Sequence, residues 1–172
     1  MRVKHVSPEE VITLTDFAVF NGHILKILYH MCMNFSAKLM PPCPVIHTSL
    51  VVPSFTGSVK KAFVRFEKKH PRVQYFLLDG SHKTTALSLS NCALPVFVIA
   101  KNRDIAQARK MVETGKLLSL TIGKTMAENI SNLRRHFTRK TRFETVGEKT
   151  RRMITRKVIP EYMRKVTRSP VR

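Results

Sequence analysis

The chain has 172 residues, of which 31 are Lys or Arg and 11 are Asp or Glu, so its formal charge at pH 7 is +20. Because 43% of the residues are hydrophobic, the composition excludes a disordered basic tail and allows one sizeable core with an appended element. A charge this high is typical of proteins that bind polyanions such as nucleic acid, anionic lipid or phosphorylated small molecules. The alternative is a scattered basic surface that only aids solubility.

The cysteines, histidines and apolar stretches exclude several further classes of protein. Cys32, Cys43 and Cys92 are an odd number with long spacings, which favours neither a disulfide framework nor a zinc site. The histidines are also too scattered for a metal site. No stretch has the roughly 18 uninterrupted apolar residues that span a bilayer, and the N-terminus has no apolar signal core. The sequence therefore predicts a soluble, cytoplasmic protein without a membrane partner or a bound metal.

The first predicted elements are a short helical turn and a long helix. Glu9 and Glu10 follow Ser7-Pro8 in the pattern of a helix start. Thr15 can then cap a helix over residues 15–35. The spacing predicts that this helix turns one apolar face toward the core, made of Phe17, Phe20, Ile24, Ile27, Leu28, Met31 and Phe35.

Three prolines between residues 41 and 44 cannot continue this helix and divide it from a predicted strand. Valines and an isoleucine favour a strand over residues 45–52, which Pro53 closes. The apolar spacing over residues 59–70 fits a helix, although a strand over residues 62–66 fits nearly as well.

The rest of the chain alternates between strands and helices and then becomes helical and basic. The pattern predicts strands over residues 73–78 and 94–99 and helices over residues 82–90, 104–112, 126–137 and 148–158. Alternation of this kind is typical of a mixed α and β domain. We therefore expect such a domain in residues 1–123 and a basic helical extension in residues 124–172.

The most informative motif lies where the strand over residues 73–78 passes into a helix. Gly80 allows a tight turn, and residues 81–84 present the free N–H groups of a helix's first turn, where the helix dipole favours an anion. Further donors at the same place are the side chains of His82, Lys83, Thr84 and Thr85. The composition is that of a phosphate cradle, although an isolated Asp-Gly-Ser also fits a capped turn in which Asp79 serves only the backbone.

Residues 76–87, followed by a Pro-Val strand at residues 94–98, resemble the signature of the ParB/sulfiredoxin superfamily. In that superfamily an apolar strand leads to Asp-Gly-x-His-Arg, a short Ala/Leu helix, and then Pro-Val and a second strand. Residues 40–46 also resemble the family's Pro-Pro-x-x-Val strand. The similarity covers about residues 3–115, two thirds of the chain.

The resemblance implies an α+β fold, a small mixed sheet with flanking helices, that binds a nucleotide at this turn. The ligand would be ATP, ADP or CTP, with or without Mg²⁺, and the residues that would bind its phosphates are Gly80, Ser81, His82, Lys83, Thr84 and Thr85. Sulfiredoxins place a catalytic cysteine immediately before the His, so Ser81 argues against sulfinic-acid reductase activity. Lys83 replaces the usual Arg, which keeps the charge but loses the planar fork that orients a phosphoryl group.

Members of the superfamily use this turn in two further ways. By analogy with its free-serine kinases, Asp16 would act as the base, and Asp79 and His82 would complete the catalytic set. ParB partition proteins instead pair the turn with a separate helical DNA-binding region, which the basic extension resembles.

The extension carries much of the positive charge. Residues 134–172 contain 14 basic and 3 acidic residues, too few carboxylates to pair the charges along a solvated helix. This shortage favours contact with nucleic-acid phosphates, through Arg134, Arg135, Arg139, Lys140, Arg142, Arg151, Arg152, Arg156 and Lys157. The contacts would be to the backbone and would depend strongly on salt.

Three hypotheses follow from the sequence. The favoured one is a ParB-like protein that binds a nucleotide at the turn and nucleic acid, DNA rather than RNA, through the extension, and that could form a homodimer. The competing hypothesis is a small-molecule kinase or nucleotide hydrolase with Asp16 as base. The third is a DNA-binding protein in which the turn is only structural.

Overall fold

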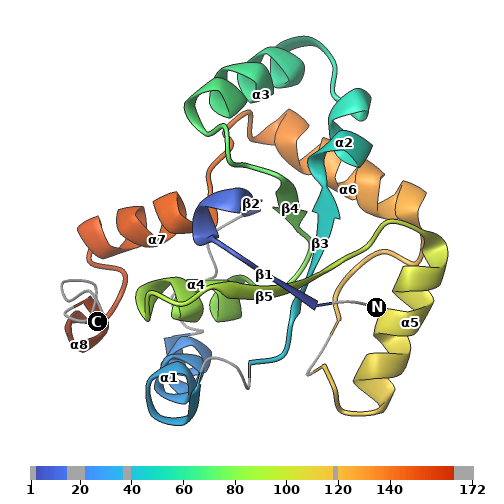
Figure 1. Ribbon diagram of the computed structural model, residues 1–172. Coiled ribbons are helices and arrows are strands. Elements are labelled where there is room, and N and C mark those ends of the chain that lie inside the picture. The colour runs from blue at the N-terminus through green and yellow to red at the C-terminus, as the bar shows by residue number, and fades with distance from the viewer. Residues whose placement is uncertain (1–2, 15–21, 37–39, 118–119, 165–172) are drawn as a thin grey trace.

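The computed structural model describes residues 3–14, 22–36, 40–117 and 120–164 and shows an α+β fold built on one mixed sheet (Figure 1). The five strands are β1 (Val3–Val6), β2 (Val11–Ile12), β3 (Cys43–His47), β4 (Tyr75–Leu77) and β5 (Leu94–Val98). Their order in the sheet is β1-β5-β3-β4-β2. The pairs β3–β5 and β2–β4 are parallel, and the pairs β1–β5 and β3–β4 are antiparallel.

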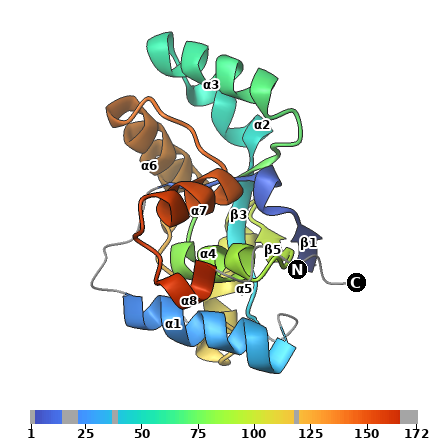
Figure 2. The same cartoon turned by 90° about the vertical axis from the view of Figure 1, so that its left-hand side faces the viewer.

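Helices cover both faces of this sheet (Figures 1 and 2). The α-helices are α1 (Gly22–Met31), α2 (Thr48–Val51), α3 (Gly57–Lys69), α4 (Ser81–Leu89), α5 (Asn102–Glu113), α6 (Met126–Arg139), α7 (Val146–Thr155) and α8 (Glu161–Arg164). A π-helical turn, Cys32–Ser36, extends α1, and two 3-10 turns lie at Pro8–Glu10 and Val52–Ser54. Among the described residues, every helix is too short or too polar to cross a bilayer.

The alternation of side chains along the strands divides the core into two halves. Val45, Leu77 and Val96 point to one face, where they pack with α1, α4, α7 and α8. Their neighbours Ile46 and Phe76 point to the other face, toward α2, α3, α5 and α6. This is the period-two pattern of strands that are buried on both sides. The second half of the core is rich in aromatic rings, among them Phe55, Phe63, Phe76, Phe97, Phe137 and Phe143.

The N-terminal half of the chain departs from the predicted elements in three places. The strand prediction over residues 45–52 is wrong beyond His47, because the chain turns there into α2, and the His47 imidazole accepts a hydrogen bond from the Ser49 N–H group. The strands β1 and β2 were not predicted, since two to four residues carry too little periodicity. Over residues 59–70 the helical alternative is correct and forms part of α3.

The predicted apolar face of the first helix is also wrong in part. Ile24 and Ile27 are 49% and 61% exposed, whereas Leu25, Leu28 and Tyr29 are buried. Almost every side chain between these positions is apolar, so spacing alone did not identify the buried face. The predicted cap at Thr15 lies outside the described residues.

Residues 126–164 contribute to both halves of the core. Helix α6 buries Leu133 and Phe137 among the aromatic rings, and α7 packs against α4 and the Pro8–Glu10 turn. Helix α7 begins two residues before its predicted start, because Thr145 and Glu148 form a capping box with N···O distances of 3.0 Å. These helices are thus packed directly onto the sheet domain.

Thr13 provides a test of packing next to β2. Its side chain is 3% exposed, and within the described part of the chain its Oγ1 atom has no hydrogen-bond partner. Because a buried unpaired hydroxyl costs about 1–3 kcal/mol, we expect Thr13→Val to raise the free energy of unfolding by about 1 kcal/mol. Urea unfolding of both proteins would measure this, and a lower stability of the variant would show that the hydroxyl is satisfied.

Candidate functional site

The motif at residues 79–87 forms a tight turn between β4 and α4, and Gly80 is essential to its geometry. Gly80 has φ 101° and ψ 32°, a left-handed conformation that other residues rarely adopt. A Cβ atom at this position would lie 2.9 Å from Cys43 Sγ, which is itself fully buried. The backbone of the turn therefore packs directly on β3 at a distance that only glycine allows.

Asp79 holds this turn in place through its two carboxylate oxygens. The Gly80 N–H group donates to Oδ1 at 2.6 Å, and the Thr121 N–H group donates to Oδ2 at 2.7 Å. Asp79 thus connects the turn to a segment 42 residues further along the chain. These contacts match the alternative in which Asp79 serves the backbone.

The hydroxyls of Thr84 and Thr85 lie away from the expected ligand. Both residues are fully buried, and their hydroxyls donate to the carbonyl oxygens of Gly80 and Ser81. Ser81, His82 and Lys83 instead line an open cleft beside the turn. Of the predicted phosphate ligands, the structure brings these three and Gly80 together.

The cleft has a volume of about 460 Å³ and two kinds of wall. The polar wall is the turn itself with Thr121, and the apolar wall consists of Ile24, Leu28 and Pro44. Helix α1 thus supplies an exposed apolar side chain, Ile24, next to the N-terminus of α4. A site with one polar end and one apolar wall suits a ligand that carries a charged group on an apolar or aromatic body.

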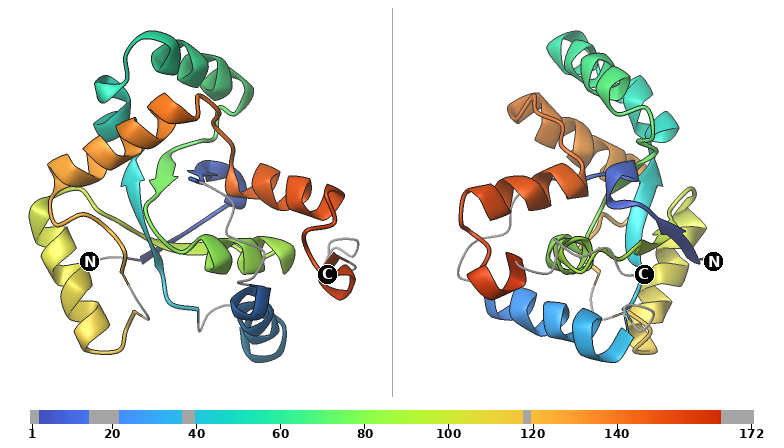
Figure 3. Two further views of the ribbon diagram at one scale, coloured as in Figure 1. Left: turned by 180° about the vertical axis from the view of Figure 1, so that it is seen from behind. Right: turned by 60° about the vertical axis from the view of Figure 1, so that its left-hand side comes forward.

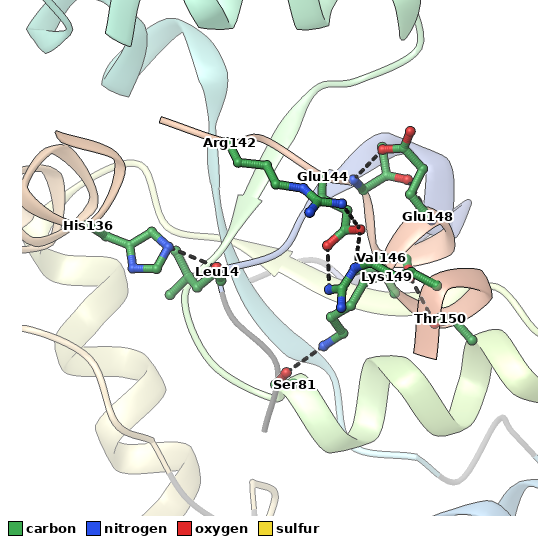
Figure 4. Close-up of polar contacts among 11 residues, drawn as sticks. Leu14, Ser81, His136, Arg142, Glu144, Val146, Glu148, Lys149 and Thr150 are labelled. Atoms are coloured by element: carbon green, nitrogen blue, oxygen red, sulfur yellow. Dashed lines mark hydrogen bonds and ion pairs between the residues drawn. The ribbon is translucent and has the colours of Figure 1, made fainter. Parts of the chain in front are cut away.

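A buried lysine from α7 reaches the same place (Figure 4). Lys149 is 0% exposed, and its Nζ atom donates a hydrogen bond to Ser81 Oγ at 2.7 Å. Lys83, on α4, donates from its own Nζ atom to the carbonyl oxygen of Pro42 at 3.2 Å. Lys83 lines the cleft and Lys149 contacts its lining residue Ser81, so two ammonium groups lie near the N-terminus of α4, which favours an anion there.

The sequence analysis did not select Lys149. The residue lies between Glu148 and Thr150 in the basic extension, which was predicted to contact nucleic acid. The capping box at Thr145 and the apolar spacing from Val146 to Met153 could have placed position 149 on the buried side of the helix. Even then, only the packing of α7 on α4 identifies Ser81 as its partner.

His82 is held in its neutral form by its surroundings. Burial lowers the pKa of the imidazole below its usual 6.5, and the charge of Lys149 lowers this pKa further. At pH 7 His82 is therefore uncharged and can donate through one ring nitrogen only.

Cys43 and Cys32 are buried thiols. Burial raises the pKa of each to about 11, so both remain protonated at neutral pH. In the part of the chain that the structure describes, no three His, Cys, Asp or Glu side chains are grouped to hold a metal ion.

Glu9 connects the Pro8–Glu10 turn to α7, the helix that carries Lys149. Its carboxylate accepts hydrogen bonds from Arg151 Nη1 at 2.7 Å and from Thr145 Oγ1 at 2.8 Å. Burial raises the pKa of Glu9, but the hydrogen bonds from Arg151 and Thr145 and the Arg151 charge outweigh it, so the pKa lies below 4.5.

Because the pKa of Glu9 is lower in the folded state, its ionised form stabilises the fold above about pH 4.5, and this is lost as the pH falls through the folded pKa. We expect Glu9→Gln to lower the free energy of unfolding at pH 7 by about 0.5–1 kcal/mol, as for a partly exposed ion pair. Urea unfolding at several pH values would measure the difference, which should shrink in acid. A difference independent of pH would contradict this account.

The predicted nucleic-acid residues fall into two groups. Arg142 and Arg152 both bind the Glu144 carboxylate, Arg152 through two contacts of 2.7 Å, and Arg151 pairs with Glu9. The expected shortage of carboxylate partners is therefore wrong for these three arginines. The partner of Arg151 could not be predicted, because Glu9 lies 142 residues away in the sequence. The remaining members are exposed: Arg134, Arg135, Arg139, Lys140, Arg156 and Lys157.

Asp16, the predicted base, lies outside the described residues.

Neither a scan against models of protein families nor searches of curated proteins and of solved structures found a match for this chain.

Proposed function

We propose that the protein binds a nucleotide, with the phosphates at residues 80–83 and the base or sugar against Ile24, Leu28 and Pro44. The observation that carries this proposal is the position of Lys149, a fully buried lysine whose ammonium group lies 2.7 Å from Ser81 at the N-terminus of α4. Together with Lys83 and the N-terminus of α4, Lys149 places a second positive charge beside the turn, which suits the phosphates of a nucleotide.

In this proposal each group of the turn has one task. The N–H groups at the start of α4 and the side chains of Lys83 and Lys149 bind phosphate oxygens, and neutral His82 donates a further hydrogen bond. Gly80 lets the backbone approach the phosphates, and Asp79 holds the turn against Thr121. The resemblance to the ParB/sulfiredoxin superfamily supports the same assignment and suggests ATP, ADP or CTP.

Binding to nucleic acid is the second part of the proposal. Arg134, Arg135 and Arg139 are exposed on α6, and none of them makes an ion pair with any described residue. Unpaired arginines on one helix suit contacts with backbone phosphates. Arg142, Arg151 and Arg152 are assigned to the structure of the fold instead.

Thermal unfolding in the presence of ATP, ADP and CTP, each with and without Mg²⁺, tests the nucleotide site. At a ligand concentration 100 times the Kd, binding stabilises the folded state by about 2.7 kcal/mol and raises the melting temperature. We expect a shift with at least one nucleotide. If none of the six conditions shifts the melting temperature of the wild-type protein, the proposal is wrong. A separate outcome concerns turnover: release of inorganic phosphate or of a nucleoside diphosphate in these samples would favour the enzyme hypothesis over a binding protein.

A further inference from the structure

A second basic surface lies on α3, a helix for which the sequence offered no function. Helix α3 contains five basic residues and one acidic residue, Glu67. Its apolar side, with Val59, Phe63 and Phe66, is buried in the aromatic half of the core. The opposite side is exposed and carries Lys61, Arg65, Lys68 and Lys69, and Arg72 follows in the next turn.

The charges of α3 are not neutralised by neighbouring carboxylates. None of its Lys and Arg side chains makes a hydrogen bond or an ion pair with any residue that the structure describes. This distinguishes α3 from α7, where Arg151 and Arg152 bind Glu9 and Glu144. Five like charges on one helix destabilise the folded state by mutual repulsion, and a bound polyanion would relieve it.

Helix α3 lies next to α6, another helix with exposed cations. Phe143, just beyond α6, packs against Phe63 and Phe66 with ring centroids 5.3 Å and 5.8 Å apart. His70, at the end of α3, contacts Glu148 at 3.1 Å. Figures 1 and 3 show α3 and α6 as neighbours at one end of the molecule. The exposed lysines of α3 and arginines of α6 therefore lie on two neighbouring helices.

We propose that α3 and the C-terminal part of α6 together form a docking surface for the phosphate backbone of duplex DNA. Lys61 and Lys68 are seven residues apart, about 10 Å along the axis of α3. This distance is roughly three times the rise per phosphate of one strand along the duplex axis. Arg65 lies between them. This inference rests on the proposed binding of nucleic acid and adds a second helix to it.

The chemistry of α3 fits nucleic acid better than an anionic membrane. A helix that lies in a membrane interface must offer an apolar face to the acyl chains. The apolar face of α3 is occupied by the protein core, and the sole large apolar side chain exposed among the residues of this helix is Val64, at 38%. The exposed side of α3 is therefore a row of cations without an apolar face, and such a row suits the regularly spaced phosphates of nucleic acid.

A salt series with two matched double variants tests the proposal. The Kd for a fluorescent DNA duplex of about 20 base pairs would be measured by anisotropy for the wild type, for Lys61→Gln/Lys68→Gln and for Lys110→Gln/Lys116→Gln. The control removes the same charge from exposed positions on α5 and just after it, away from α3 (Figure 1). We expect the α3 variant alone to bind more weakly and to lower the log–log salt slope by about 1.8, which corresponds to two lost phosphate contacts.

Four other results would overturn the proposal in distinguishable ways. Equal losses in both variants would show that only net charge matters. An unchanged α3 variant, with weaker binding by Arg134→Gln/Arg135→Gln, would leave α6 as the DNA surface without α3. A wild type that binds phosphatidylserine vesicles through Lys61 and Lys68, but not DNA, would make the surface a membrane contact. A wild type that binds neither would refute nucleic-acid binding itself, whereas the nucleotide site is tested separately by thermal unfolding.

Discussion

Replacement of Lys149 by methionine is expected to weaken nucleotide binding by roughly 10- to 150-fold. Hydrogen bonds to charged groups contribute about 1.5–3 kcal/mol each, and a change of 1.4 kcal/mol is tenfold in Kd. Methionine has a similar length and fills the space between α7 and α4, so the variant removes the ammonium group while it keeps most of the packing. The affinity is measured by calorimetric titration with whichever nucleotide stabilises the wild type.

Two further variants separate the local charge from other effects. Lys116→Met removes the same charge at an exposed position and should leave the affinity unchanged. Ser81→Ala removes the hydroxyl that contacts Lys149 Nζ and should weaken binding by a smaller factor, because the N–H groups of α4 remain. If Lys149→Met folds, as judged by circular dichroism, and binds nucleotide as tightly as the wild type, Lys149 has no part in the site.

Gly80→Ala is expected to lower the free energy of unfolding by about 2–4 kcal/mol. Two costs add at this position: the left-handed φ of 101° strains an alanine, and the new methyl group would meet Cys43 Sγ at 2.9 Å. Cys43 is fully buried on β3 and cannot move aside without disturbing the sheet. Urea unfolding measures the loss, and we expect the nucleotide-dependent thermal shift to disappear as well, since the turn must open.

Gly115→Ala is the matched control for Gly80→Ala. Gly115 also has a positive φ, +69°, but a Cβ atom there would meet nothing within 4 Å. Gly115→Ala should therefore lower the free energy of unfolding by the backbone strain alone, about 1–2 kcal/mol. Cys43→Ala combined with Gly80→Ala should restore part of the lost stability, because the shorter side chain removes the collision. Equal losses for the two glycines would mean that the contact with Cys43 contributes nothing.

The net charge of +20 has different roles in different parts of the structure. Arg142, Arg151 and Arg152 stabilise the fold through Glu144 and Glu9. Lys149 is buried beside Ser81, at a distance where it can act on a bound anion. The exposed lysines and arginines of α3 and α6 remain for a polymeric partner. A count of charges along the sequence cannot make this division, since it depends on which carboxylate lies beside which cation.

Most regular elements could be predicted because their signals are local. The helices α3, α4, α5 and α6 each show apolar residues at helical spacing, and β4 and β5 are short apolar runs bounded by turn residues. Residues 48–52 were predicted as strand from their β-branched side chains, yet they turn into α2. There the chain leaves the sheet after His47, whose imidazole caps α2 by accepting a hydrogen bond from the Ser49 N–H group.

The motif at residues 79–83 was identifiable from the sequence alone, since glycine, a strand end and a helix start are neighbours in the chain. The partners of these residues were not. Cys43, Thr121 and Lys149 come from three other segments, between 37 and 68 residues away from the residues they approach, and the local sequence pattern does not predict such contacts. Local sequence therefore determined the turn, the helices and the excess of positive charge. The tertiary structure decided which lysine lies beside Ser81, which arginines are neutralised and which helix faces remain charged, because each depends on the packing of distant segments.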